Sequence, residues 1–561
     1  MHDLAIRNAI ICDGSGAPRY PGEVAVTDGM ISELGPQVGR AHEEVDADGQ
    51  VLAPGIIDNH THYDAQITWD AYASPTLGLG VTTLIMGNCG FTIAPCRPGD
   101  REQTLKNLTQ VEGMSLDALL EGTRTEFETF SDYLGMIESL GVVPNVAVYC
   151  GHSSVRTWVM GEDAVKRTAT DGEITAMQAV IKEALAQGAI GFATSTFEGH
   201  NGWGGVPMPS RFADQAEMAA LVGTLGEVGA GRFMLTKGNP SPVPYLERLA
   251  ASTGQPVAVA AIQYDHSKPE RAFGDMQAIG EAVERGARMM GQVACTAISM
   301  DFTLRSAYLF EALKAWKPAI GMYDDVDALR RFYRDRSFRA AMQAELLDPK
   351  ALNRFTDQWD KVEILEVAKQ EHRALEGRMV AELAREAGKD PLDWLLDFGD
   401  SEDFQTLFNA QILNADEDQV LHLLKHPHST IGLADAGAHL FLFCDADFGL
   451  HLLGHWTRER GDFSLEEAVA ELTSRQADAY GIQKRGLLRE GYHADLLLFD
   501  PVTVGRGAKE RVFDLPAGAS RLIRHGNGIA GLWVNGVRVM DGQGVIHNGA
   551  RPGRVLREFN A

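Results

Sequence analysis

The 561-residue chain lacks the features that mark membrane and secreted proteins. It has no run of about 18 apolar residues, the length that a membrane-spanning helix requires. Its first residues, MHDLAIRNAIICDGSG, include no basic segment followed by a long apolar core, so no signal peptide is expected. The six cysteines are scattered, which favours reduced thiols over a disulfide framework. These absences predict a cytoplasmic protein with no membrane partner.

Positive charge is also scarce. The chain has 51 lysine and arginine residues against 77 aspartate and glutamate residues, which gives a formal net charge of −26. An excess of this sign repels the phosphate backbone of nucleic acids, so no nucleic-acid partner is expected. A small substrate remains compatible, because a local pocket can carry the opposite charge. The sequence shows no coiled coil and no internal repeat, and it leaves the oligomeric state open.

Both ends of the chain have the pattern of short β-strands. Apolar runs are separated by turn pairs such as Asp28-Gly29 and Asn535-Gly536, and the second of these is a strong hairpin signal. We expect residues 1–52 and 484–561 to pair with one another. Together they would form one small β-sandwich domain beside the middle of the chain.

The middle of the chain, residues 53–483, alternates helix with strand. A helical apolar stripe from Ile174 to Leu185 precedes a buried strand at 189–193, and further strands are expected at 233–235 and 257–262. Such repeats predict an α/β fold with a parallel sheet, either doubly wound or closed into a (β/α)8 TIM-like barrel. No G-x-G-x-x-G follows a strand in a nucleotide-binding layout, which weakens the doubly wound alternative. Residues from about 270 to 428 exceed one βα unit and are interpreted as an inserted helical lid region.

Potential ligands follow the first two expected strands of the barrel. His60 and His62 end the run APGIIDNHTH, and residues i and i+2 of a strand point to the same side. Two such imidazoles form half of a metal site, and an ordinary pair of histidines is the alternative. Cys89 lies in TTLIMGNCG, where it is either a thiolate ligand or a small buried apolar residue.

Two later strands end in the same way. His266 follows the run AVAAI, and Asp435 follows IGLA among small residues that leave room for a substrate. A carboxylate in that place is either a general base or the cap of the next turn. The carboxyl ends of barrel strands meet at one mouth, so the joint occurrence of these residues predicts a metal-dependent active site.

These motifs resemble the amidohydrolase superfamily and, within it, the D-aminoacylase (N-acyl-D-amino-acid deacylase) family. The resemblance extends over nearly the whole chain and includes VLAPGIIDNHTHYD, GNCGFTIAP, GHSSVR, LADAG and WVNGVRVMDG. It implies a (β/α)8 barrel, a small β-sandwich built from both termini and one or two Zn²⁺ ions per chain.

The resemblance also implies roles for individual residues. His60 and His62 would hold the weaker metal position, Cys89 would be the thiolate ligand of the tight zinc, and His266 would be the histidine that ends the sixth strand. Asp435 would take a proton from the metal-bound water and give it to the leaving nitrogen of a C–N amide bond.

One departure from the family concerns Lys237, which stands where the family has a zinc histidine in a T-H-M-R context. A neutral lysine could be a ligand, or it could react with CO₂ to give a carbamate that bridges two metals. The alternative is that the fifth-strand metal ligand is lost and the site holds one metal or none. The arginine that helps the family to hold the substrate's carboxylate is replaced by Gly238-Asn239.

The expected substrate is a small-molecule amide. Arg156 is a candidate for binding an anionic group, with a structural ion pair as its alternative. Phe197, Trp203 and Tyr264 are predicted to line an aromatic subsite or simply to pack loops. The sequence thus predicts a zinc-dependent hydrolase, acting on an N-acyl amino acid or a related small amide. A cyclic amide, lactone or aryl amide is the alternative substrate, and a non-catalytic metal- or ligand-binding barrel is the alternative function.

Overall fold

The computed structural model describes residues 1–348, 355, 357–438 and 446–560. They form two compact units: Met1–Ile262, Gly274–Cys295 and Leu421–Ala561 in the first, and Gln263–Phe273 and Thr296–Val420 in the second. In the described part of the chain, no helix is long and apolar enough to cross a membrane. The five described cysteines form no disulfide, and Cys444 lies outside the described residues.

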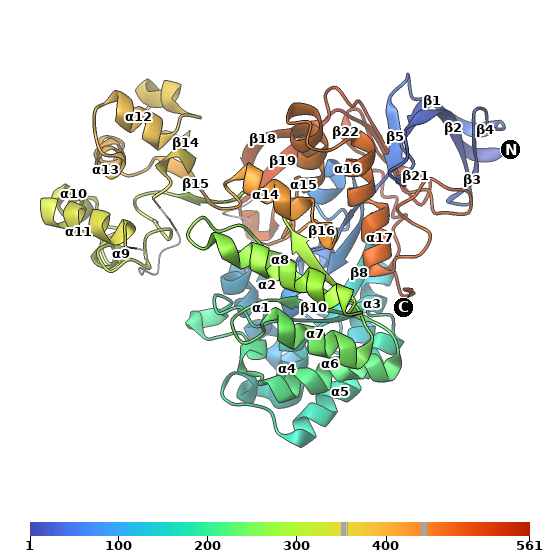
Figure 1. Cartoon of the computed structure of the whole chain (residues 1–561), viewed down its shortest axis with the longest axis horizontal. Coiled ribbons are helices and arrows are strands. Elements are labelled where there is room, and N and C mark those ends of the chain that lie inside the picture. The colour runs from blue at the N-terminus through green and yellow to red at the C-terminus, as the bar shows by residue number, and fades with distance from the viewer. Residues whose placement is uncertain (349–354, 356, 439–445, 561) are drawn as a thin grey trace. The chain divides into compact units, whose positions relative to one another are not determined.

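An eight-stranded sheet is the framework of the first unit (Figure 1). All neighbouring strands are parallel, in the order β16-β12-β11-β10-β9-β8-β7-β6. The two outermost strands are joined by a parallel bridge between Thr61 and Ala436. The sheet therefore curls back toward its own start, a mixed α/β fold that fits the predicted TIM-like barrel. Its strands are β6 (Ile56–Asp58), β7 (Val81–Met86), β8 (Asn145–Gly151), β9 (Gly191–Ser195), β10 (Arg232–Thr236), β11 (Val257–Ile262), β12 (Met289–Val293) and β16 (Ser429–Ile431).

Several helices of this unit begin at residues whose side chains cap them. Helix α5 (Asp171–Ala186) starts with a capping box between Thr170 and Glu173 and buries one apolar face. Strand β9 follows at 191–195 rather than at the expected 189–193, so its end reaches Ser195. The other helices are α1 (Arg101–Val111), α2 (Leu116–Gly122), α3 (Phe130–Leu140), α4 (His152–Met160), α6 (Gln215–Val228), α7 (Val243–Thr253), α15 (Phe448–His451), α16 (Leu465–Leu472) and α17 (Ser474–Tyr480). Helices α8 (Pro269–Glu284) and α14 (Glu417–Leu424) each contain residues of both units.

Strands from both ends of the chain share a nine-stranded sheet, joined where β5 pairs antiparallel with β17. The turn Asn535-Gly536 connects β20 to β21, and both residues have positive φ, as a tight hairpin requires. A cluster of buried apolar residues that includes Ile6, Leu496 and Trp533 packs around this sheet. The predicted division at residues 52 and 484 stays a prediction. The strands are β1 (His2–Ile11), β2 (Tyr20–Thr27), β3 (Met30–Gly35), β4 (Ala41–Asp46), β5 (Val51–Pro54), β17 (Leu496–Phe499), β20 (Ile529–Val534), β21 (Val537–Asp541) and β22 (Gly544–Val545), and β18 (Gly505–Val512) with β19 (Arg521–Asn527) forms a separate ribbon.

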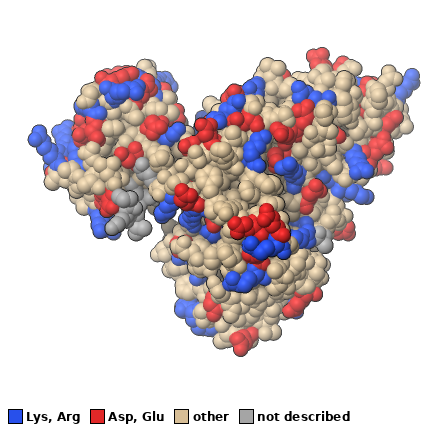
Figure 2. All heavy atoms as spheres, viewed as in Figure 1, with Lys and Arg blue, Asp and Glu red and all other residues tan. Residues whose placement is uncertain are grey.

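The second unit overlaps the expected insertion and contains a sheet as well as helices. An antiparallel sheet has the order β13-β15-β14. The role of this unit as a lid stays a prediction. Its elements are β13 (Ile298–Phe302), β14 (Val362–Glu366), β15 (Leu407–Leu413), α9 (Lys317–Ile320), α10 (Val326–Arg334), α11 (Arg336–Leu346), α12 (Val380–Glu386) and α13 (Pro391–Ser401). Acidic and basic side chains are interspersed over the face that Figure 2 shows, so the net charge of −26 does not gather in one patch there.

Buried Asn59 connects the first strand of the parallel sheet to the last. Its side-chain oxygen accepts from the N–H of Leu433 at 3.2 Å, and its side-chain nitrogen donates to Gln476 at 2.8 Å. A Cβ at Gly432 would lie 2.1 Å from the Asn59 oxygen, so only glycine allows this approach.

The substitution Asn59→Ala tests this connection. It would leave a buried donor and a buried acceptor without partners, at a cost of about 1–3 kcal/mol for each group. We expect a lower midpoint of thermal unfolding than for Asn548→Ala, which alters an exposed asparagine. Equal midpoints for the two variants would contradict this account of the connection.

Candidate metal centre

Four potential ligand atoms face one another where β6, β7 and β16 end. The Nε2 atoms of His60 and His62 lie 3.5 and 4.0 Å from the Sγ of Cys89. They lie 3.2 and 3.4 Å from Oδ1 of Asp435. The structure thus brings together four of the predicted site residues from three separate strands of the parallel sheet.

The histidine pair lies just past its strand rather than on it, because β6 ends at Asp58. The predicted alternation nevertheless persists in this extension. The intervening Thr61 bridges to Ala436, and the N–H of His62 donates to the Ala436 carbonyl at 2.7 Å. With the chain held in this way, both imidazoles remain directed to the same point.

The backbone at Cys89 and Asp435 is in the left-handed region, with φ of 57° and 47°. Few residues other than glycine adopt this conformation, and such strain concentrates at functional sites. At the neighbouring Gly90, φ is +74° and a Cβ would lie 2.5 Å from the carbonyl oxygen of Ala193. The glycines around Cys89 therefore allow the tight turn that directs its thiol toward the histidines.

Each imidazole is held from behind through its other nitrogen. The side-chain oxygen of Gln292, on β12, accepts from Nδ1 of His60 at 2.8 Å. The carboxylate of Glu112, directly after α1, lies 3.2 Å from Nδ1 of His62, and both side chains are 3% exposed. Partners at Nδ1 leave Nε2 of each ring for a metal, the arrangement usual for histidine ligands.

Burial and charge act on the protonation of this site. Burial raises the pKa of the Cys89 thiol well above its usual value, and the charges of Glu112 and Asp435 add to this effect. Burial alone would also raise the pKa of Asp435, but its hydrogen bonds with the two histidines outweigh this, and the pKa lies well below its usual value. The site therefore gathers negative charge around a thiol that a metal cation would deprotonate.

The ligand atoms of His60, His62 and Cys89 all lie within 4.8 Å of one another, as the ligands of one shared metal ion would. Zinc bonds of about 2.0–2.3 Å at tetrahedral angles separate neighbouring nitrogen and oxygen ligands by about 3.3 Å, and nitrogen and sulfur ligands by about 3.6 Å. The observed separations are 3.2 and 3.4 Å for the first kind and 3.5 and 4.0 Å for the second. Imidazole, thiolate and carboxylate are also the donors that zinc prefers.

Lys237, a predicted metal ligand, forms an ion pair with Asp275. Its ammonium donates to Asp275 of α8 at 2.8 Å. On the same strand, Met234 and Thr236 both contact Cys89. Because side chains alternate along a strand, Lys237 faces the helix layer while Thr236 faces the thiol. Ligation by Lys237 would require its amine to leave the ion pair.

The remaining predicted residues are spread over both units. His266 and Tyr264 belong to the second unit. Arg156 is fully buried and pairs with Glu217, which is the ion pair that the sequence allowed as an alternative. Phe197 and Trp203 are 37% and 45% exposed. The predicted binding roles of these residues stay predictions.

The sequence analysis missed Glu112 and Gln292. Glu112 lies four residues after Leu108, so it continues the apolar face of α1 that also includes Leu105. A carboxylate in line with such a face is a detectable signal of a buried charge. Gln292 is a polar residue inside the otherwise apolar strand β12, which is the same kind of signal.

The substitution Glu112→Gln tests the support behind His62. It preserves the size of the side chain but removes the carboxyl group beside Nδ1 of His62, so we expect zinc affinity to fall about 10–100-fold. Competition with a chromogenic chelator measures this affinity. The matched control is Glu102→Gln on the same helix, whose side chain is 68% exposed. Equal affinities of the two variants would contradict the role of Glu112.

Comparisons with known proteins show the family to which the chain belongs. The model of the amidohydrolase family matches residues 43–540. A D-aminoacylase of Alcaligenes xylosoxydans xylosoxydans is 28% identical over 99% of this chain and 97% of that protein. An N-acyl-D-aspartate deacylase of the same organism is 29% identical over 100% of this chain and 96% of that protein.

Two solved structures share the fold. A D-aminoacylase with a binuclear metal centre aligns with a TM-score of 0.65 at 25% identity, covering 100% of both chains. An N-acyl-D-glutamate deacylase of Bordetella bronchiseptica, complexed with zinc and a phosphonate inhibitor, aligns with a TM-score of 0.67 at 24% identity, covering 99% of this chain and 100% of that one. The chain therefore belongs to the amidohydrolase family, in the group of the D-aminoacylases, and is a metal-dependent hydrolase that acts on C–N amide bonds.

Proposed function

We propose that the chain removes the acyl group from an N-acyl amino acid or a related small amide, with a zinc ion held by His60, His62 and Cys89. The observation that carries this proposal is the buried group of His60, His62 and Cys89, whose ligand atoms all lie within 4.8 Å of one another, with Asp435 beside both histidines. The substrate class is supported by two relatives, a D-aminoacylase and an N-acyl-D-aspartate deacylase, that match nearly the full length of the chain.

Different residues of the chain would carry out different steps of the hydrolysis. When bound, the ion supplies polarisation of the amide carbonyl and lowers the pKa of water. Asp435 would accept the proton of the attacking water and give it to the departing nitrogen. Its side chain is 28% exposed, against 1% for His60 and 3% for His62, so it is the part of the site that a substrate reaches. Gln292 and Glu112 would keep the two rings in place.

The number of ions depends on two residues that stay proposals. Lys237 would be a ligand if it were neutral, or would bridge two metals as a carbamate, and His266 stays a predicted ligand. The pair with Asp275 opposes this role, because an ammonium that donates to a carboxylate has no lone pair for a metal. We therefore expect one zinc per chain as long as that ion pair persists.

A cyclic amide, lactone or aryl amide is the second candidate substrate. Gly238-Asn239 stands where the family has an arginine for the substrate's carboxylate, and Arg156 already pairs with Glu217. Both observations favour a substrate that needs no carboxylate recognition at these positions. The same carboxylate base would serve any of these acyl transfers.

The substitution Asp435→Asn tests the proposed reaction. The amide preserves the shape of the side chain but accepts no proton at neutral pH, so we expect hydrolysis to fall at least about 100-fold. Rates would be measured on N-acyl-D-amino acids, N-acyl-L-amino acids, a hydantoin and an aryl amide. Zinc per chain would be determined in the same samples.

The matched control for this experiment is Asp171→Asn, which alters an exposed aspartate in the first turn of α5. We expect the control to keep both its rate and its zinc. An equal rate for Asp435→Asn and the wild type on every substrate would contradict the role of Asp435. A wild-type chain with zinc and no rate on any substrate would contradict the proposed function.

A further inference from the structure

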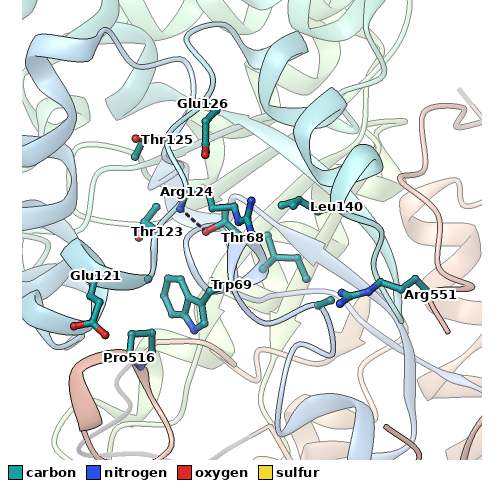
Figure 3. Close-up of a pocket in the computed structure, with 13 residues that line it drawn as sticks. Thr68, Trp69, Glu121, Thr123, Arg124, Thr125, Glu126, Leu140, Pro516 and Arg551 are labelled. Atoms are coloured by element: carbon teal, nitrogen blue, oxygen red, sulfur yellow. Dashed lines mark hydrogen bonds between the residues drawn. The ribbon is translucent and has the colours of Figure 1, made fainter. Parts of the chain in front are cut away.

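The first unit contains a cavity of about 660 Å³ that none of the roles above uses (Figure 3). Ile67, Ala71 and Leu140 contribute apolar side chains to its lining, and Trp69 adds an indole ring. The ring is fixed by close packing, since a Cβ at Gly122 would lie 2.9 Å from it. The cavity therefore offers a flat aromatic surface beside mainly polar walls, which include Thr68, Thr123 and Thr125.

Two guanidinium groups extend toward this cavity from different sides, those of Arg124 and Arg551 (Figure 3). Among the described residues, the Arg124 side chain makes neither an ion pair nor a hydrogen bond; its backbone N–H donates to Thr68. Arg551 donates only to the backbone carbonyl of Gly141, at 3.3 Å. Both arginines are exposed, and neither is paired with a carboxylate among the residues that the structure describes.

Two acidic residues line the same cavity without neutralising these arginines. One carboxylate oxygen of Glu121 accepts from the N–H of Ala517 at 3.2 Å. No ion pair within 4.0 Å joins Glu121 or Glu126 to either arginine in the part of the chain described. Two guanidinium groups directed to one space favour an anion between them, and their forked donors match a carboxylate or a phosphate.

A third arginine lines an adjoining cavity of about 890 Å³, which shares Arg124, Glu126 and Leu140. This residue is Arg101, at the start of α1. It donates through Nη2 to the carbonyl of Phe127 at 3.0 Å, while its buried Nε has no hydrogen-bond partner. The guanidinium of Arg101 adds a third positive charge to the walls of the two adjoining cavities.

We propose that these adjoining cavities bind a small organic anion. Arg124 and Arg551 would hold its carboxylate or phosphate group, and its flat apolar part would lie against Trp69. The site would be separate from the metal centre, because none of its lining residues is among the facing ligands or their supports. The proposal does not depend on the chemistry that the metal centre performs.

Isothermal titration calorimetry with phenyl phosphate, benzoate and inorganic phosphate tests the proposal on the full-length, zinc-loaded chain. We expect saturable binding of phenyl phosphate or benzoate, and weaker binding of inorganic phosphate, which lacks the ring. Arg124→Gln and Arg551→Gln should each weaken the binding at least about 10-fold, since each removes one charged fork. Trp69→Ala should weaken the binding of phenyl phosphate and benzoate and leave the binding of inorganic phosphate unchanged.

Two further variants make the result specific. Arg97→Gln is the matched control, because Arg97 is an exposed arginine that lies over a different indole, that of Trp158. It should bind the probes as the wild type does. Cys89→Ser disturbs the metal centre and should also leave this binding unchanged. Absence of saturable binding for all probes, unchanged binding in both arginine variants, or loss of binding in Cys89→Ser would each overturn the proposal.

Discussion

Two imidazoles, a thiol and a carboxylate can serve a metal only if their ligand atoms converge, and the contacts behind the two imidazoles favour this arrangement. Gln292 holds His60 and Glu112 lies against His62, each through Nδ1. Without these partners the rings could rotate or adopt the other tautomer, and Nε2 would no longer face the thiol of Cys89. The supports also differ in chemistry, because one is an amide and the other a carboxyl group whose pKa is raised well above its usual value by burial and by the charges of Asp435 and Asp64.

The parallel sheet places these groups within reach of one another. His60 and His62 follow the strand at one end of the sheet order, and Asp435 follows the strand at the other end. Their meeting therefore depends on the bridge between Thr61 and Ala436 and on the buried contacts of Asn59. The left-handed backbone at Cys89 and Asp435 completes the convergence by turning both side chains inward. The contacts of Thr61 and Asn59 thus both stabilise the place where the first and last strands of the sheet meet and set the geometry of the site.

The sequence alone identified the residues that directly follow strands. His60, His62, Cys89 and Asp435 each come after a short apolar run, and the carboxyl ends of parallel strands share one edge. Glu112 and Gln292 were not predicted, because their role depends on contacts with histidines that lie 50 and 232 residues away in the chain. Lys237 shows a different limit. Its place in the family motif suggested a ligand, but strand alternation directs Thr236 to the thiol and Lys237 to Asp275. The second unit was expected as a helical insertion, and its three-stranded sheet pairs strands too distant in sequence for a local pattern to reveal.

The account rests on one claim, that Cys89 and the two histidines share a single metal ion. X-ray absorption spectroscopy of the zinc-loaded chain tests it most directly, because it reports the identity and distance of the atoms bound to the metal. The account predicts one sulfur at about 2.3 Å together with imidazole nitrogens at about 2.0 Å, and loss of the sulfur contribution in Cys89→Ser. A spectrum of oxygen and nitrogen ligands alone, unchanged in Cys89→Ser, would contradict it.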